Sequence, residues 1–112
     1  GPEAVDYPDI AAQAARLVAR KEVDAAIVID GAGIGSAIAA NKVRGVRAAM
    51  CNDKTLARYA REHNGANVLT LGATLLSADE AKAIVDTWLG TPMSEARYIR
   101  RLAKIRGLEQ AQ

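Results

Sequence analysis

The sequence contains 112 residues with a net charge of +2, and half of the residues are hydrophobic although none is Phe. This length supports a single domain spanning residues 1–112, with a core of Ala, Val, Ile and Leu that suits helices packed on a parallel sheet. The net charge is too small to argue by itself for nucleic-acid or membrane binding, and no apolar run approaches the roughly 18 residues of a membrane-spanning helix. The single cysteine, Cys51, excludes an internal disulfide and a multi-cysteine metal site, as is typical of a reducing cytosol.

Periodicity and turn residues predict helices that alternate with short apolar strands. In chain order these are a helix over residues 9–21, a strand over 25–29, a helix over 36–41, a strand over 46–50, a helix ending near 63, a strand over 67–71, a helix opened by a capping box over 77–80, and an amphipathic helix over about 94–109. The alternation predicts a three-layer α/β/α, Rossmann-like fold with a small parallel sheet. Three strands leave two sheet edges that need cover.

The clearest chemical signal is a glycine-rich segment after the first predicted strand. Gly31, Gly33 and Gly35 alternate between that strand and a helix, so their backbone N–H groups can converge on an anion. The spacing is neither the dinucleotide fingerprint nor a P-loop. An anion site and a plain tight turn both fit the pattern.

Asp30 stands at the carboxyl end of the same strand, where ligands bind in open α/β sheets, and could serve either as a general base or as a turn-forming cap. His63 is the only histidine and lies at a predicted helix end. There it is either catalytic or a structural residue stabilised by the helix dipole. Arg97 and Arg101 are one helical turn apart and form either a solvated face or a phosphate clamp. Cys51 is predicted to be a buried small residue, with no neighbour that would lower its pKa.

Several segments together resemble ribose-5-phosphate isomerase B and its galactose-6-phosphate isomerase relatives. In order these are residues 6–8, 30–35, 38–42, 45–48, 61–64, 67–69 and 84–89. The resemblance implies a five-stranded family sheet and a metal-independent, cofactor-free aldose–ketose isomerase that acts through an enediolate.

The resemblance also implies roles for particular residues. Gly31, Gly33 and Gly35 would hold the developing oxyanion, and His63 would help open the sugar ring. Asn64 would contact the reacting oxygens, and Arg97 and Arg101 would grip the phosphate. Because the family builds its site between two subunits, a homodimer or higher homo-oligomer is implied.

The sequence departs from the family pattern in two respects. Asp30 stands where the family commonly has a catalytic Cys, Ala32 stands where it has Thr or Ser, and Ser36 stands where other branches have Glu. The family's first strand, helix and strand, which carry an Asp-His pair, have no counterpart in these 112 residues. We therefore expect a chain shortened relative to the family.

These departures favour a catalytically impaired member that serves as an assembly or sugar-phosphate-binding module. The alternative is an active isomerase of ribose 5-phosphate with Asp30 as the base in place of the family Cys. A sugar phosphate is the expected ligand, with no nucleic acid and no membrane as partner. A cytoplasmic location is expected, with recruitment to a bacterial microcompartment as a variant suggested by analogy.

Overall fold

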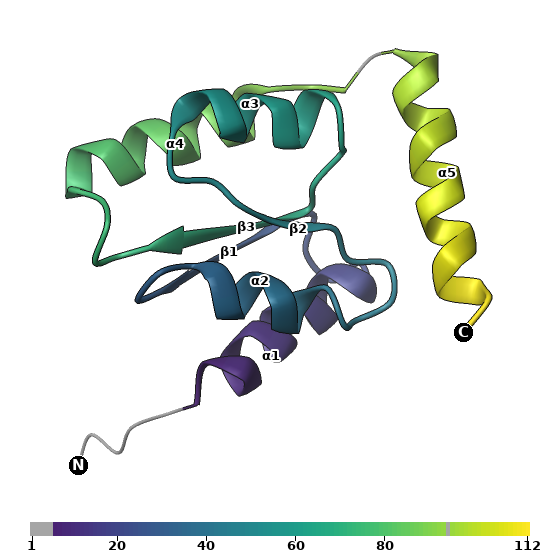
Figure 1. Ribbon diagram of the computed structural model, residues 1–112, viewed down its shortest axis with the longest axis horizontal. Helices are drawn as coiled ribbons and strands as arrows, with labels where there is room; N and C mark the ends of the chain where they lie inside the picture. The colour runs from purple at the N-terminus through teal and green to yellow at the C-terminus, as the bar shows by residue number, and fades with distance from the viewer. Residues whose placement is uncertain (1–5, 94) are drawn as a thin grey trace.

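The computed structural model describes residues 6–93 and 95–112. Its elements are α1 (Tyr7–Ala19), β1 (Ala26–Asp30), α2 (Ile34–Ala40), β2 (Ala48–Met50), α3 (Lys54–Glu62), β3 (Val68–Gly72), α4 (Ala78–Gly90) and α5 (Ala96–Gln110) (Figure 1). Every predicted helix and strand is confirmed, with ends displaced by up to about two residues, as is usual for helix termini. Ser94, the predicted start of the last helix, lies outside the described residues.

The three strands form one parallel sheet in the order β1-β3-β2. Ala26 pairs with Val68 and Asp30 pairs with Gly72, so the strands end together at the same edge. All five residues of the central strand β3 are buried. This burial explains why β3 is an almost continuous apolar run, as parallel strands covered on both faces are.

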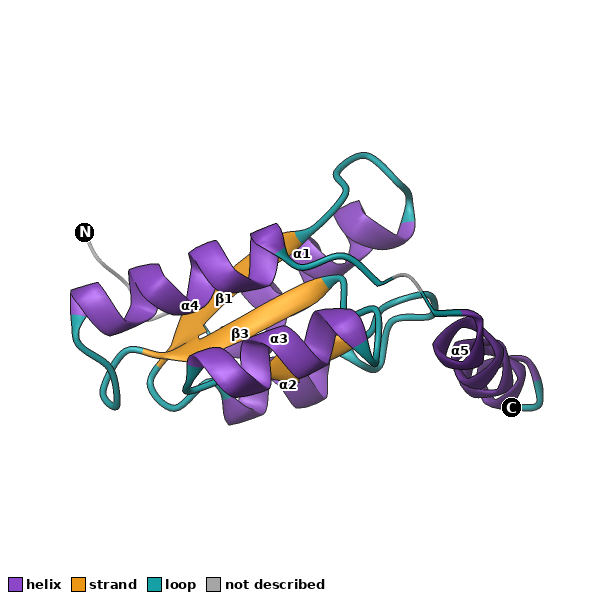
Figure 2. Ribbon diagram, turned by 90° about the horizontal axis from the view of Figure 1, so that it is seen from above, coloured by secondary structure: helices purple, strands orange, loops and turns teal. Residues whose placement is uncertain are grey.

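Helices cover both faces of the sheet, which confirms the predicted three-layer α/β/α fold (Figure 2). Leu69 and Leu71 of β3 point to the face covered by α3 and α4, where they pack with Trp88 and Ile84. Val68 points to the opposite face, which α1 and α2 cover with small side chains. The alternation along β3 therefore divides the core into two layers, one on each side of the sheet.

Helix starts follow the capping chemistry in the sequence. Ser77 and Glu80 form the predicted capping box at the start of α4, and the side chain of Asp53 accepts a hydrogen bond from the Leu56 amide at the start of α3. Pro8 lies in the first turn of α1, where its missing N–H costs no helical hydrogen bond. The caps of α3 and α4 fix the positions at which the chain leaves β2 and β3 for the next helix.

Two parts of the described chain are thinly covered. On β1, the side chains of Ile27 and Ile29 are 38% and 62% exposed, although they share the sheet face that α3 and α4 cover elsewhere. Helix α5 stands to one side of the layers (Figure 1), and Tyr98 is its only buried residue. No helix among the described residues is long and apolar enough to cross a membrane.

Candidate functional site

The glycine loop, residues 30–35, joins β1 to α2 at the carboxyl end of the sheet. Gly33 has a φ of +81° and is the N-cap of α2. A β-carbon at this position would lie 2.9 Å from the backbone of Leu71 and equally close to the Met50 side chain. Glycine is therefore required by both the left-handed backbone and the close approach to the sheet.

The carboxylate of Asp30 is bound by the loop that follows it. Its Oδ1 accepts a hydrogen bond from the Gly33 amide, and its Oδ2 accepts one from the Ser36 amide at 3.2 Å and one from the Ser36 hydroxyl at 2.6 Å. Ser36 is fully buried, so its hydroxyl has little other choice of partner. The turn-forming role that the sequence left open for Asp30 is thus present in the structure.

These contacts set the charge state of Asp30. Burial alone would raise its pKa, but the Ser36 hydroxyl and the backbone amides of Gly33 and Ser36 stabilise the charged form and lower the pKa below its usual value. A carboxylate held in this way is a weak base. Of the three glycine amides predicted to hold an external anion, that of Gly33 already donates to the chain's own anion, Asp30, as does the neighbouring Ser36 amide.

Two threonines that the sequence analysis did not single out fix the glycine loop to the sheet. The buried Thr70 hydroxyl donates to the Gly33 carbonyl at 2.6 Å, and the Thr74 hydroxyl donates to the Gly31 carbonyl at the same distance. The available signal was a threonine in the middle of the apolar strand β3 and a second threonine two residues after its end. These two hydrogen bonds tie the carbonyls of Gly31 and Gly33 to β3 and to the turn after it.

A second group of predicted site residues lies around the end of α3. The His63 ring is stacked between the rings of Tyr59 and Tyr98, with centroid separations of 4.7 and 4.8 Å. Its Nε2 lies 3.8 Å from a carboxylate oxygen of Glu62. The exposed Asn64 donates from its side chain to the Tyr59 carbonyl at 3.1 Å. Tyr98 of α5 is buried and therefore also holds His63 in place.

The start of α5 adds the two predicted phosphate-binding arginines to this second group. The guanidinium of Arg97 lies over the Tyr98 ring at 4.9 Å, donates to the Tyr98 hydroxyl at 2.9 Å, and pairs with Glu95 at 2.8 Å. The hydrogen bond to Tyr98 and the charge of Glu95 raise the pKa of Arg97. Arg101 is exposed one turn further along α5. We call His63, Asn64, Arg97 and Arg101 the α3–α5 cluster.

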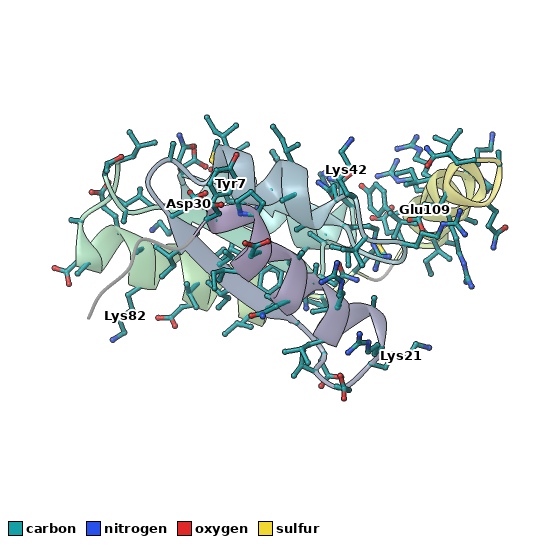
Figure 3. All side chains as sticks on the ribbon, turned by 90° about the horizontal axis from the view of Figure 1, so that it is seen from below. Tyr7, Lys21, Asp30, Lys42, Lys82 and Glu109 are labelled. Atoms are coloured by element: carbon teal, nitrogen blue, oxygen red, sulfur yellow. The ribbon has the colours of Figure 1, made fainter. Side chains whose placement is uncertain are left out.

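The glycine loop and the α3–α5 cluster lie at opposite ends of the sheet. Asp30 ends β1, whereas His63 precedes β3, and these two strands are paired in parallel. Five residues of β3 at about 3.3 Å per residue separate the two ends by roughly 16 Å. Figure 3 shows Asp30 and Glu109, a residue of α5, on opposite sides of the molecule. One copy of the chain does not bring all the predicted site residues together.

Comparison with known proteins assigns the chain to a family. The profile described as Ribose/Galactose Isomerase matches residues 1–105. Ribose-5-phosphate isomerase B of Escherichia coli is 44% identical over 108 residues, which cover 96% of this chain and 72% of that protein. The chain belongs to the ribose/galactose isomerase family. Its resemblance to this family is therefore confirmed.

Solved structures of family members show the same fold. The type B ribose 5-phosphate isomerase of Trypanosoma cruzi superposes with a TM-score of 0.96 at 46% identity, over 98% of this chain and 74% of that one. A Mycoplasma genitalium ribose-5-phosphate isomerase B, solved with bound ribulose-5-phosphate, superposes with a TM-score of 0.92 at 37% identity, over 100% of this chain and 77% of that one. This chain thus corresponds to about three quarters of these isomerases.

Neither the single thiol nor a group of metal-ligating side chains adds a further reactive centre among the described residues. Burial, with a smaller contribution from the Asp53 carboxylate, raises the pKa of the Cys51 thiol to about 11, which fits its predicted role as a buried small residue. Among residues 6–93 and 95–112, no three His, Cys, Asp or Glu side chains gather closely enough to hold a metal ion.

Proposed function

We propose that this family member binds a sugar phosphate, that its isomerase activity is impaired in this chain, and that it serves as an assembly or sugar-phosphate-binding module. The observation that carries the proposed impairment is the hydrogen bonding and the lowered pKa of Asp30. A general base needs a free lone pair within reach of the substrate proton and a pKa near the working pH. Asp30 instead directs both carboxylate oxygens into its own loop, and its pKa is lowered.

We further propose that the binding site is completed by two copies of the chain. The glycine loop of one copy would face the α3–α5 cluster of another, because within one copy these groups lie at opposite ends of the sheet. Arg97 is already oriented by Tyr98 and Glu95, and Arg101 is exposed one turn away, so the pair can hold a phosphate between two guanidinium groups. The bound ribulose-5-phosphate of the Mycoplasma genitalium relative supports a phosphorylated sugar as the ligand class.

Calorimetric titration with ribose 5-phosphate tests the binding proposal. We expect heat from the parent chain and its loss in Arg101→Ala. The matched control is Arg100→Ala, which removes an equally exposed arginine from the neighbouring position of α5 and is expected to bind like the parent. Undetectable heat in the parent, or equal heat in the parent and Arg101→Ala, would remove the binding proposal.

A coupled assay of ribose 5-phosphate isomerisation tests the proposed impairment. We expect little or no turnover, and we expect Asp30→Cys alone to restore none. The alternative function, an active isomerase with Asp30 as the base, predicts turnover at ordinary enzyme rates that Asp30→Asn abolishes. That result would contradict the proposed impairment and leave the sugar-phosphate site intact.

Light scattering tests whether copies associate. The apolar side chains of Ile27 and Ile29 along β1, with the unpaired backbone of that edge in the described sheet, favour association. We expect a dimer or larger species. A stable monomer at tens of micromolar protein would contradict the two-copy site.

A further inference from the structure

A cavity of about 760 Å³ lies at the end of the sheet opposite the glycine loop, between α5 and the body of the domain. Its wall comes from four parts of the chain: the end of α1 with the turn after it, residues 44–47, the end of α3 with the turn that leads to β3, and residues 102–110 of α5. This volume falls within the roughly 300–1,000 Å³ typical of small-molecule sites. The predicted sugar-phosphate residues His63, Asn64, Arg97 and Arg101 are not among those that line it.

The cavity has a strong excess of positive charge. Five cationic side chains line it, against the two carboxylates of Asp24 and Glu109. The cationic residues are Lys21, Arg44, Arg47, Arg61 and Arg106. Among the described residues none of the five takes part in a salt bridge. One oxygen of Glu109 accepts a hydrogen bond from the Gly45 amide at 2.8 Å, so this carboxylate is partly engaged by backbone.

Two of the arginines are fixed in place by the fold. The Nε of Arg47 donates to the Gly65 carbonyl at 2.9 Å, and a terminal nitrogen of Arg61 donates to the Ala66 carbonyl at 2.6 Å. The Arg61 guanidinium also lies 4.5 Å from the centre of the buried Trp88 ring. Its Nε is buried and has no hydrogen-bond partner in the described structure. The guanidinium groups of Arg47 and Arg61 are therefore ordered, and both residues belong to the cavity wall.

The charges in the cavity repel one another. Burial lowers the pKa of the Arg47 guanidinium, Glu109 acts in the opposite direction, and the positive charge of Arg61 lowers the pKa further. A bound anion would offset the cost of burying the Arg47 charge and would reduce the repulsion between the two arginines. Apolar side chains, Val18, Leu102 and Ile105 among them, complete the wall and would contact an organic body.

We propose that this cavity is a second ligand site, distinct from the proposed sugar-phosphate site, that takes a phosphate-bearing small molecule with at least two negative charges. Guanidinium groups bind phosphate oxygens through paired, charge-assisted hydrogen bonds, and Arg47 and Arg61 are held ready for such contacts. The more exposed Lys21, Arg44 and Arg106 supply further charge at the rim. The site does not depend on the glycine loop or on a second copy of the chain.

Inorganic pyrophosphate is the probe, followed by calorimetry and by the emission of Trp88, the only tryptophan. Because Arg61 stacks on Trp88, binding in the cavity should change this emission, whereas binding at Arg101 should not. We expect a dissociation constant of about 1 mM or tighter. The double variant Arg44→Gln with Arg106→Gln should weaken binding at least about tenfold, since each tenfold step needs only about 1.4 kcal/mol.

The matched control is the double variant Arg16→Gln with Arg100→Gln, which removes the same charge from exposed positions outside the cavity and should bind like the parent. Arg101→Gln should also retain pyrophosphate binding, which separates this site from the proposed sugar-phosphate site. Absence of binding to the parent, equal weakening in the two double variants, or loss confined to Arg101→Gln would overturn the proposal.

Discussion

Replacing Asp30 by alanine should lower stability and at the same time raise the affinity of the glycine loop for an anion. The variant loses hydrogen bonds from the Gly33 amide and from the amide and hydroxyl of Ser36. Asp30 is not the N-cap of α2, but it accepts a hydrogen bond from an amide in the first turn as a capping side chain does. Loss of such a contact costs about 0.5–2 kcal/mol, and hydrogen bonds to charged groups contribute about 1.5–3 kcal/mol each without adding fully. We expect the free energy of unfolding in urea to fall by about 1–3 kcal/mol.

The gain in anion affinity follows from the charge that is removed. A unit negative charge about 5 Å from a bound phosphate opposes it by roughly 1–3 kcal/mol for effective dielectric constants between about 80 and 20, which corresponds to about 5- to 150-fold in affinity. Titration with inorganic phosphate, followed at the backbone amides of Gly33 and Ser36 by NMR, measures this change. In the parent these amides donate to Asp30. In Asp30→Ala they should show a saturable shift at lower phosphate concentration.

Asp53→Ala is the matched control, because Asp53 caps α3 through a single hydrogen bond to the Leu56 amide and lies outside the glycine loop. It should cost about 1 kcal/mol of stability and leave anion binding at the loop unchanged. Equal phosphate affinity in parent and Asp30→Ala would refute the reasoning.

The stabilisation by Asp30 should also depend on pH. Because the pKa of Asp30 is lowered in the folded chain, this stabilisation is present above the unfolded pKa of about 3.9 and is lost as pH falls through the lower folded value.

Three further predictions concern the backbone and the single thiol. Gly33→Ala should reduce the free energy of unfolding by about 2–4 kcal/mol through backbone strain and collision with Met50, while Gly31→Ala, which meets no neighbour, should stay within about 0.5 kcal/mol in the same urea titration. Lys21→Gly should raise the free energy of unfolding by about 1 kcal/mol, because Lys21 has a φ of +62° in the turn that ends α1 and glycine adopts this backbone without strain. The same change should weaken pyrophosphate binding, because it removes a positive charge from the cavity. Cys51 should react with a thiol reagent at pH 8 only as fast as the chain unfolds; rapid labelling of the native chain would contradict its raised pKa.

The sequence predicted the elements of the fold well because each depends on local signals. The capping box at Ser77 and the turn at the end of β1 are encoded within a few residues, and both lie where they were predicted. The separation of Asp30 from His63 was also accessible, since one follows its strand and the other precedes its strand in a parallel sheet. The separation is consistent with the two-subunit site that the resemblance implied.

The rest depended on contacts between distant segments. No local pattern indicates that Tyr98 stacks on His63, because these residues meet only when α5 folds back toward the end of α3. The basic cavity is equally inaccessible from the sequence: Lys21, Arg61 and Arg106 are far apart along the chain, and each alone resembles a solvated surface residue. The sequence left open whether Asp30 is a general base or a turn-forming cap. Only the geometry of the loop shows that its carboxylate binds the amide of Gly33 and the amide and hydroxyl of Ser36.

The thin attachment of α5 has a consequence for affinity. Tyr98 is its only buried side chain, and Ile99, Ile105 and Leu108 remain 44–67% exposed. Such a helix can open without unfolding the sheet, so its amides should exchange with solvent far sooner than those of β3. Any ligand that needs Arg97 or Arg106 in position then binds with its intrinsic affinity multiplied by the fraction of time the helix is docked. A partner that binds and stabilises docked α5 would raise the affinity of both proposed sites for their ligands without contacting either ligand.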